Sequence, residues 1–298
     1  MSKATLVRAV LLSVVLYRGT YVASAESIGE PGGSGPFPAT AEVRADLSGF
    51  TVYRPVKFPE NPMPLFVWGN GGCSNNGLAH SAYLRQIASH GFFVVSLGTP
   101  AGAQSPAPAA APDQDPTQAG QMIEAIDWAT REAARQGSDL YRRIDLTRIA
   151  VGGHSCGGLQ ALAVSHDPRI KTTLVLDSGI YNIPGGRSHV NVDKSQLARL
   201  HGPMLYLIGG PSDIAYPNAS DDVARIEKVP VFFANLPVGH GGTFASPNGG
   251  EWATVSTQWL EWQLKSNADA SRDFAGAECR LCKDGRWTIV QKQMPMSK

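Results

Sequence analysis

Six predominantly apolar runs constrain the fold of this chain more than any other feature. A strand covered on one face alternates apolar and polar residues, whereas these runs are apolar on both faces, as in a parallel sheet that helices cover on both sides. The runs are 65–68, 92–97, 149–151, 172–176, 204–208 and 231–236. Helical patterns lie between them. The sequence therefore predicts an α/β fold with a mostly parallel central sheet and helices on both faces.

The composition is that of one ordinary globular enzyme domain. The chain has 298 residues, of which 43% are hydrophobic, so it can bury a large core. Its formal net charge is +1 and only 17% of its residues are charged. This balance supplies no basic surface for nucleic acid or acidic lipid. We expect a monomer that acts on small neutral or weakly charged molecules.

The ends of the chain carry signals of their own. Residues 1–25 have a basic start, a short apolar core and small residues before Ala25, which predicts a signal peptide and a secreted protein. No segment is long and apolar enough to span a membrane. Residues 26–39 are rich in glycine, proline and serine and predict a flexible lead-in. We expect a catalytic domain at 40–268, followed by a tail at 269–298 that packs on it. Export also makes Asn218, in the sequon Asn-Ala-Ser, a candidate glycosylation site.

Ser155 lies in the motif Gly153-His-Ser-Cys-Gly157, between an apolar strand pattern and the helical pattern that begins at Leu159. A turn sharp enough to expose a serine hydroxyl above a sheet leaves no room for side chains at the two flanking glycines. This order of strand, G-x-S-x-G and helix is typical of a nucleophile elbow. We therefore interpret Ser155 as a nucleophile.

With strand, elbow and helix in this order, the chain resembles the α/β-hydrolase family, specifically secreted serine esterases with a dienelactone-hydrolase or cutinase-like core. The resemblance covers roughly residues 52–264. It implies the α/β-hydrolase fold and a nucleophile, acid and histidine in that chain order. The stretch at 178–202 is too short for a separate domain, so we expect no large cap domain.

The resemblance also implies the partners of the serine. His240 follows the last strand pattern in a glycine-rich loop, where the family places its base, and Asp213 follows the run 204–208, where the family places its acid. Asp177, at the end of the preceding run, is the alternative acid, because some members use that position. His154 is too close to Ser155 along the chain to act as its base, and we expect it to line the pocket.

The residues that stabilise negative charge on the substrate are expected in two loops. The amide of Cys156 follows the nucleophile at the start of a helix, and a second amide, of Gly72 or Cys73, comes from the glycine-rich loop after the run 65–68. Asn70 stands in this loop where histidine is usual, and we expect it in the pocket. The resemblance brings the two loops together and implies a disulfide between Cys73 and Cys156. Cys279 and Cys282 would then form a local pair.

The resulting prediction is hydrolysis of carboxylic esters through an acyl-enzyme, without a metal or an organic cofactor. Because no bulky apolar lid is expected, short or medium acyl esters or an accessible polymer are favoured as substrates. A serine peptidase or an acyltransferase on the same triad is an alternative, since the triad does not select the leaving group. A catalytically silent hydrolase-like binding protein is a further alternative.

Overall fold

The computed structural model describes residues 1, 25–100, 116–183 and 190–295, and the predicted signal peptide lies almost entirely outside them. Across the described residues, ten strands form one sheet in the order β1-β2-β3-β5-β4-β6-β7-β8-β9-β10. The strands are β1 (Ala25–Gly32), β2 (Ala39–Arg44), β3 (Phe50–Pro55), β4 (Met63–Gly69), β5 (Phe93–Leu97), β6 (Ile144–His154), β7 (Ile170–Leu176), β8 (Met204–Ile208), β9 (Val231–Asn235) and β10 (Thr288–Lys292). The six central strands are parallel, and β1, β2, β3 and β10 pair antiparallel at the margins. This mostly parallel sheet with helices confirms the predicted fold class.

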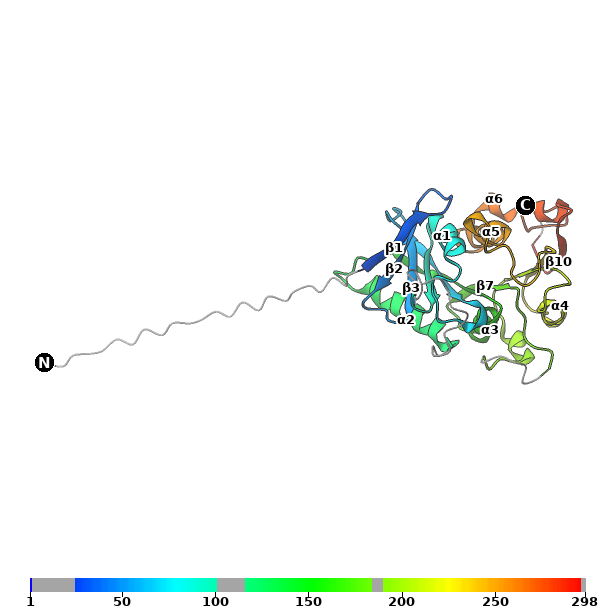
Figure 1. Ribbon diagram of the computed structural model, residues 1–298, viewed down its shortest axis with the longest axis horizontal. Helices are drawn as coiled ribbons and strands as arrows, with labels where there is room; N and C mark the ends of the chain where they lie inside the picture. Colours follow the sequence, from blue (N-terminus) through cyan, green and yellow to red (C-terminus); the bar gives the residue numbers. More distant parts are fainter. Residues whose placement is uncertain (2–24, 101–115, 184–189, 296–298) are drawn as a thin grey trace.

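Helices cover both faces of the sheet, as the predominantly apolar runs indicate. The helices are α1 (Ser81–Ser89), α2 (Gly120–Ala134), α3 (Cys156–Val164), α4 (Tyr216–Arg225), α5 (Gly250–Lys265), α6 (Ala268–Ser271) and α7 (Arg280–Lys283). In β4, Phe66 and Trp68 pack in the core layer under α1 and α5, whereas Leu65 and Val67 pack in the layer under α2. Figure 1 shows α1 and α5 on one side of the sheet and α2 and α3 on the other. Both faces of the central strands are therefore buried.

The predicted flexible lead-in at 26–39 is wrong, because this segment contains an edge strand. β1 pairs with β2 although most of its side chains are exposed. Its backbone bonds replace the apolar contacts that the composition lacks, and the Arg85 guanidinium adds a bond of 2.7 Å to the carbonyl of Ile28. Gly33 and Gly35 then pass against α1, where a Cβ atom at either position would lie 2.4 Å or less from Ser89. The folded unit thus begins about fifteen residues earlier than the expected boundary at 40.

The C-terminal segment joins the same sheet. β10 pairs with β9 from Thr288 to Lys292, and the side chains of Phe274 and Trp287 are buried in the main core. A disulfide between Cys279 and Cys282 closes the turn between them. The segment predicted to be a tail packed on the domain therefore contains the last strand of that domain.

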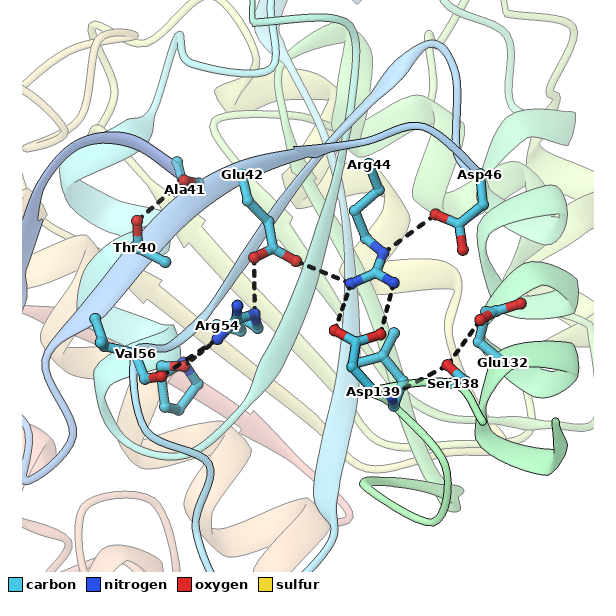
Figure 2. A network of polar contacts seen from close by, with 12 residues as sticks. Thr40, Ala41, Glu42, Arg44, Asp46, Arg54, Val56, Glu132, Ser138 and Asp139 are labelled. Atoms are coloured by element: carbon cyan, nitrogen blue, oxygen red, sulfur yellow. Dashed lines mark hydrogen bonds and ion pairs between the residues drawn. The ribbon is translucent and has the colours of Figure 1, made fainter. Parts of the chain in front are cut away.

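A buried ion-pair network holds β2 and β3 to the turn after α2 (Figure 2). The Arg44 guanidinium donates two bonds, of 2.8 and 3.0 Å, to the carboxylate of Asp139, and further bonds of 3.2 Å to Glu42 and Asp46. Glu42 also accepts a bond of 2.8 Å from Arg54. The side chains of Arg44 and Glu42 are fully buried. An unpaired charge is costly to bury, so the ion-pair network is stable only while each buried charged side chain keeps its partner.

Within the described ranges, no helix combines the length and apolar character that crossing a bilayer requires.

Candidate active site

Ser155 occupies the sharp turn between β6 and α3, with backbone angles φ 52° and ψ −118°. This conformation is strained for a residue other than glycine, and such strain gathers at functional sites. The flanking glycines are required by packing, since a Cβ atom on Gly157 would lie 2.0 Å from the Gly69 carbonyl oxygen. A Cβ atom on Gly153 would lie 2.2 Å from the backbone of Gly157. The backbone thus has the shape of a nucleophile elbow.

Three side chains from distant parts of the chain meet at this turn. His240, in the loop after β9, has Nε2 2.9 Å from Oγ of Ser155 and Nδ1 2.6 Å from Oδ1 of Asp213, which follows β8. A carboxylate at Nδ1 favours the tautomer with its proton on Nδ1. Nε2 is then free to accept the proton of the serine hydroxyl. The structure brings together the three residues that the sequence analysis selected as nucleophile, base and acid.

The surroundings of Asp213 favour its ionised form. The side chain is buried, which by itself raises the pKa of a carboxyl group. The hydrogen bond from His240 and those from the backbone amides of Ala215 (2.8 Å) and Gly209 (3.2 Å) outweigh burial and lower the pKa. A negative charge is therefore held beside Nδ1 of His240, where it can stabilise a protonated imidazole.

A disulfide joins the two loops that were expected to stabilise negative charge. Cys73 and Cys156 are bonded, with their Cα atoms 5.1 Å apart, as the resemblance implies. Gly72 and Cys156 line the cavity at Ser155, whereas Cys73 is fully buried behind it. The bond fixes the turn at Gly71–Cys73 to the first residue of α3.

Asn70 takes a different place from the expected pocket position. Its side chain is fully buried, and its amide group donates to the carbonyls of Leu97 (2.7 Å) and Asn76 (3.1 Å). Its oxygen accepts a bond of 3.1 Å from the indole of Trp68. The amide faces inward because these buried carbonyls need a donor. Asn70 therefore braces the loop and does not line the cavity that contains Ser155.

His154 connects two loops of the site and is not among the residues that line the cavity. Its Nε2 lies 2.9 Å from the backbone oxygen of His240 and donates to it. Its ring also packs on the turn after β4, since a Cβ atom on Gly71 would lie 2.5 Å from Nδ1. Burial lowers the pKa of His154 to about 4 and keeps the ring neutral. The sequence places His154 next to the nucleophile but does not indicate this bracing contact.

Asp177, the alternative acid, lies at the end of β7 and is fully buried. Its Oδ2 accepts a bond of 2.9 Å from the indole of Trp252 and lies 3.8 Å from Nε2 of His154. The carboxylate that bonds Nδ1 of His240 is that of Asp213. Asp177 belongs to the site through its contacts with Trp252 and His154, and not as the partner of Nδ1 of His240.

An open cavity of about 270 Å³ lies over Ser155. Its wall is apolar in part, with Leu159, Tyr181 and Ile214 among the lining residues, and the Ile214 side chain is 76% exposed. Asn218, the residue of the sequon, also lines the cavity from α4, and its side-chain oxygen accepts a bond of 3.1 Å from the amide of Asn182. A substrate in this cavity meets an apolar rim and a reactive hydroxyl together.

Comparisons with known proteins agree with the fold and the elbow. A family model described as "PETase: PET hydrolase-like" matches residues 35–178, which include Ser155 and both cysteines of the Cys73–Cys156 bond. The chain is 30% identical over 149 residues to "Cutinase est1" of Thermobifida alba, covering 48% of this chain and 45% of that protein. It is 32% identical over 149 residues to "Cutinase 2" of Thermobifida cellulosilytica, covering 48% and 51%.

The chain spans about half the length of the curated relatives it matches. The family match ends at residue 178, so Asp213 and His240 lie beyond it, and their placement here comes from the structure alone. The matches support an ester hydrolase. With the ten-stranded sheet and the strained serine between β6 and α3, they show an α/β-hydrolase fold in a chain that is similar to cutinases and PET hydrolases.

Proposed function

We propose that the protein is a secreted serine hydrolase that cleaves carboxylic esters through an acyl-enzyme. The observation that carries this proposal is the continuous chain of contacts from Asp213 through His240 to Ser155 beside an open cavity. A serine hydroxyl is a weak nucleophile until a base takes its proton, and the 2.9 Å contact between Nε2 of His240 and Oγ of Ser155 supports such a transfer.

In the first half of the reaction, Oγ of Ser155 attacks the ester carbonyl carbon while Nε2 of His240 takes the hydroxyl proton. The carbonyl oxygen gains the negative charge, which the amide of Cys156 and an amide of the Gly72–Cys73 turn stabilise. The tetrahedral intermediate then collapses, the bond to the alcohol breaks, and His240 gives its proton to the leaving oxygen. Asp213 stabilises the imidazolium between these transfers.

In the second half, water replaces the alcohol. His240 takes a proton from the water, whose oxygen attacks the acyl carbon. The bond to Oγ breaks as His240 returns the proton to Ser155, and the carboxylic acid leaves. Each step uses only the ester, water and the three side chains, so its balance requires no further reactant.

The cavity supports short or medium acyl esters, or an accessible polyester, as substrates. Exposed apolar side chains gather around its mouth, where Tyr181 and Ile214 line it and Val238 lies two residues before His240. Exposed apolar side chains next to a reactive site provide contact area for an apolar acyl chain or a polymer surface. The names of the similar proteins, cutinase and PET hydrolase, point to the same substrate class.

Secretion is supported by the sequence pattern of residues 1–25 and by the two disulfides, which form and persist in oxidising compartments.

The test is hydrolysis of a short aryl ester by the wild-type protein and by Ser155→Ala and His240→Gln. Each substitution is expected to lower kcat by at least about 10⁴-fold, because the triad acts as a unit. His166→Gln, at an exposed histidine outside the site, serves as the matched control and should retain the wild-type rate. Ester hydrolysis that survives in Ser155→Ala would overturn the proposal.

The leaving group is tested with a matched aryl amide and with an added alcohol acceptor. The proposal expects ester cleavage to exceed amide cleavage and water to be the main acceptor. Preferred amide cleavage would indicate a peptidase, and ester formation with the alcohol an acyltransferase. A folded wild-type protein inactive on all of these substrates would indicate a binding protein.

A further inference from the structure

Two aspartates stand side by side at the ends of neighbouring strands, and the mechanism above uses only one of them. β7 and β8 are paired in parallel, and the amide of Asp177 continues the ladder with a bond of 2.8 Å to the carbonyl of Leu207. Asp213 lies in the turn that follows β8, and its carboxyl group lies close enough to that of Asp177 for each to shift the pKa of the other. The backbone of Asp177 has φ 46°, a left-handed conformation that is uncommon outside glycine. This position is therefore strained in the same way as Ser155.

The contacts of Asp177 are those of a carboxylic acid. Its Oδ2 accepts a bond of 2.9 Å from the indole nitrogen of Trp252 in α5. Its Oδ1 is buried and meets no hydrogen-bond donor among the described residues. Two carboxyl groups in close contact repel each other when both are ionised, and the contact becomes favourable when one of them carries a proton that it can donate to the other. A proton on Oδ1 of Asp177 gives this buried oxygen a hydrogen bond to make, whereas no surrounding group donates one to it.

The donors around the pair decide which carboxyl group is protonated. Asp213 receives N–H bonds from His240, Ala215 and Gly209, which favour its anion. Asp177 receives the bond from Trp252 and a weaker contribution from the amide of Gly209, and it faces the anion of Asp213. Burial and, after it, the charge of Asp213 raise the pKa of Asp177 to about 9. The other titratable groups facing Asp177 are His154 on β6, which is neutral, and His240 behind Asp213.

We propose that Asp177 is a positioning residue for the triad: a neutral carboxylic acid that donates its proton to the carboxylate of Asp213 and accepts the indole N–H of Trp252. Its bond orients Asp213 toward Nδ1 of His240, and its second oxygen ties that arrangement to α5. The glycine-rich loop packs on the same pair of residues, since a Cβ atom on Gly242 would lie 2.6 Å from Trp252 and 2.8 Å from Asp177. This role rests on the proposed function, because it acts through the base of that reaction.

The role predicts a loss of activity at high pH. The neutral form of Asp177 is the working form, so the arrangement is complete below pH about 9 and is lost as pH rises through that value. Ionised Asp177 would place a second negative charge against Asp213 and remove the donor from their hydrogen bond. Asn at this position has the same shape, donates through its amide and accepts from Trp252, but does not ionise. Ala removes both contacts.

The first test is kinetic and uses Asp177→Asn and Asp177→Ala with a short aryl ester. We expect Asp177→Ala to lower kcat about tenfold or more with little change in KM, because Asp177, although it lines the cavity, is fully buried and acts through Asp213. Asp177→Asn is expected to recover most of that loss and to abolish the decline of activity above pH about 9. If Asn is as damaging as Ala, or if the decline at high pH persists in it, the role is refuted.

The second test reads the proton directly and does not depend on activity. At pH about 8, infrared spectra of the resting wild-type protein should contain the C=O band of a protonated buried carboxyl group, and Asp177→Asn should lack it. Asp222→Asn is the matched control, because Asp222 is equally buried but pairs with Lys194 at 2.6 Å and has a pKa of about 6, so it is ionised at that pH. Absence of the band, or its persistence in Asp177→Asn, overturns the assignment.

The two tests separate the two proposals. A protein that shows the band but does not hydrolyse esters would contradict the proposed function while leaving the protonated Asp177 in place. An active esterase without the band would contradict this inference alone.

Discussion

The sulfur atoms of Cys73 and Cys156 join the turn after β4 to the residue that follows Ser155, the proposed nucleophile, across 83 positions of the chain. Amides placed where negative charge develops contribute to catalysis only if they are held in place before the reaction. The bond therefore links the stability of the fold to the geometry of the proposed oxyanion site.

Replacing both Cys73 and Cys156 by Ser is expected to lower the free energy of unfolding by about 2–4 kcal/mol, because the bond closes a long loop. We also expect a lower kcat on a short ester under native conditions. The matched control is Cys279→Ser with Cys282→Ser, whose bond spans only three positions. Urea unfolding and steady-state kinetics measure the two effects. Equal stability and activity of both double variants would contradict the link.

Ile214→Ser is expected to change substrate preference more than catalysis. Ile214 is exposed and lines the cavity, so it supplies apolar contact to an acyl chain that reaches beyond the carbonyl group. We expect kcat/KM for a hexanoyl aryl ester to fall about three- to tenfold while that for the acetyl ester changes little. Ile183→Ser, at an equally exposed isoleucine that does not line this cavity, should leave both values unchanged. The same ratio in all three proteins would rule out Ile214 as an acyl contact.

Arg44→Met is expected to destabilise the fold without altering the chemistry. The substitution leaves the buried carboxylate of Glu42 with Arg54 as its remaining partner and deprives Asp139 of its paired bonds (Figure 2). We expect a loss of about 3 kcal/mol or more in the free energy of unfolding, with an unchanged kcat under native conditions. Arg286→Met, which removes an exposed ion pair with Asp284, should have no measurable effect. A variant at Arg44 as stable as the wild type would show that the network carries no stability.

His154 is expected to make the protein acid-sensitive. Its pKa is about 4 in the folded protein, below the ordinary value of 6.5, so the unfolded chain binds more protons than the folded protein between these values. Stability is therefore complete above pH about 6.5 and is lost as pH falls toward 4. His154→Gln keeps an N–H donor but does not titrate. Its free energy of unfolding should fall less steeply with decreasing pH, by up to about 1.4 kcal/mol per pH unit. Parallel curves for both proteins would contradict this origin.

The central sheet was predictable because its strands have one requirement, burial on both faces. The apolar runs correspond to β4 through β9. The marginal strands were not predictable in this way. β1 is exposed, and β2 turns Glu42 and Arg44 inward, where only their mutual pairing makes burial tolerable. In the sequence, such residues resemble those of a loop or a solvent-exposed strand.

The residues of the site likewise divide into those that the sequence predicts and those that it does not. Ser155 carries a local signal, because its turn requires glycines on both sides. His240 and Asp213 were selected by their order along the chain, and the structure places both in contact with the site. Asn70 and Asp177 could not be placed from the sequence, since their roles depend on Trp68, Trp252 and other partners that only the fold brings near. The roles of the side chains that support the triad could thus be found only from the three-dimensional structure.

The most direct test of Ser155 as a nucleophile activated by His240 is covalent labelling of the folded protein with a fluorophosphonate, followed by peptide mass spectrometry. We predict one label per chain, on Ser155. Labelling should be abolished in Ser155→Ala and strongly slowed in His240→Gln. A protein that hydrolyses esters while Ser155 remains unlabelled, or that is labelled at the wild-type rate without His240, would contradict this prediction.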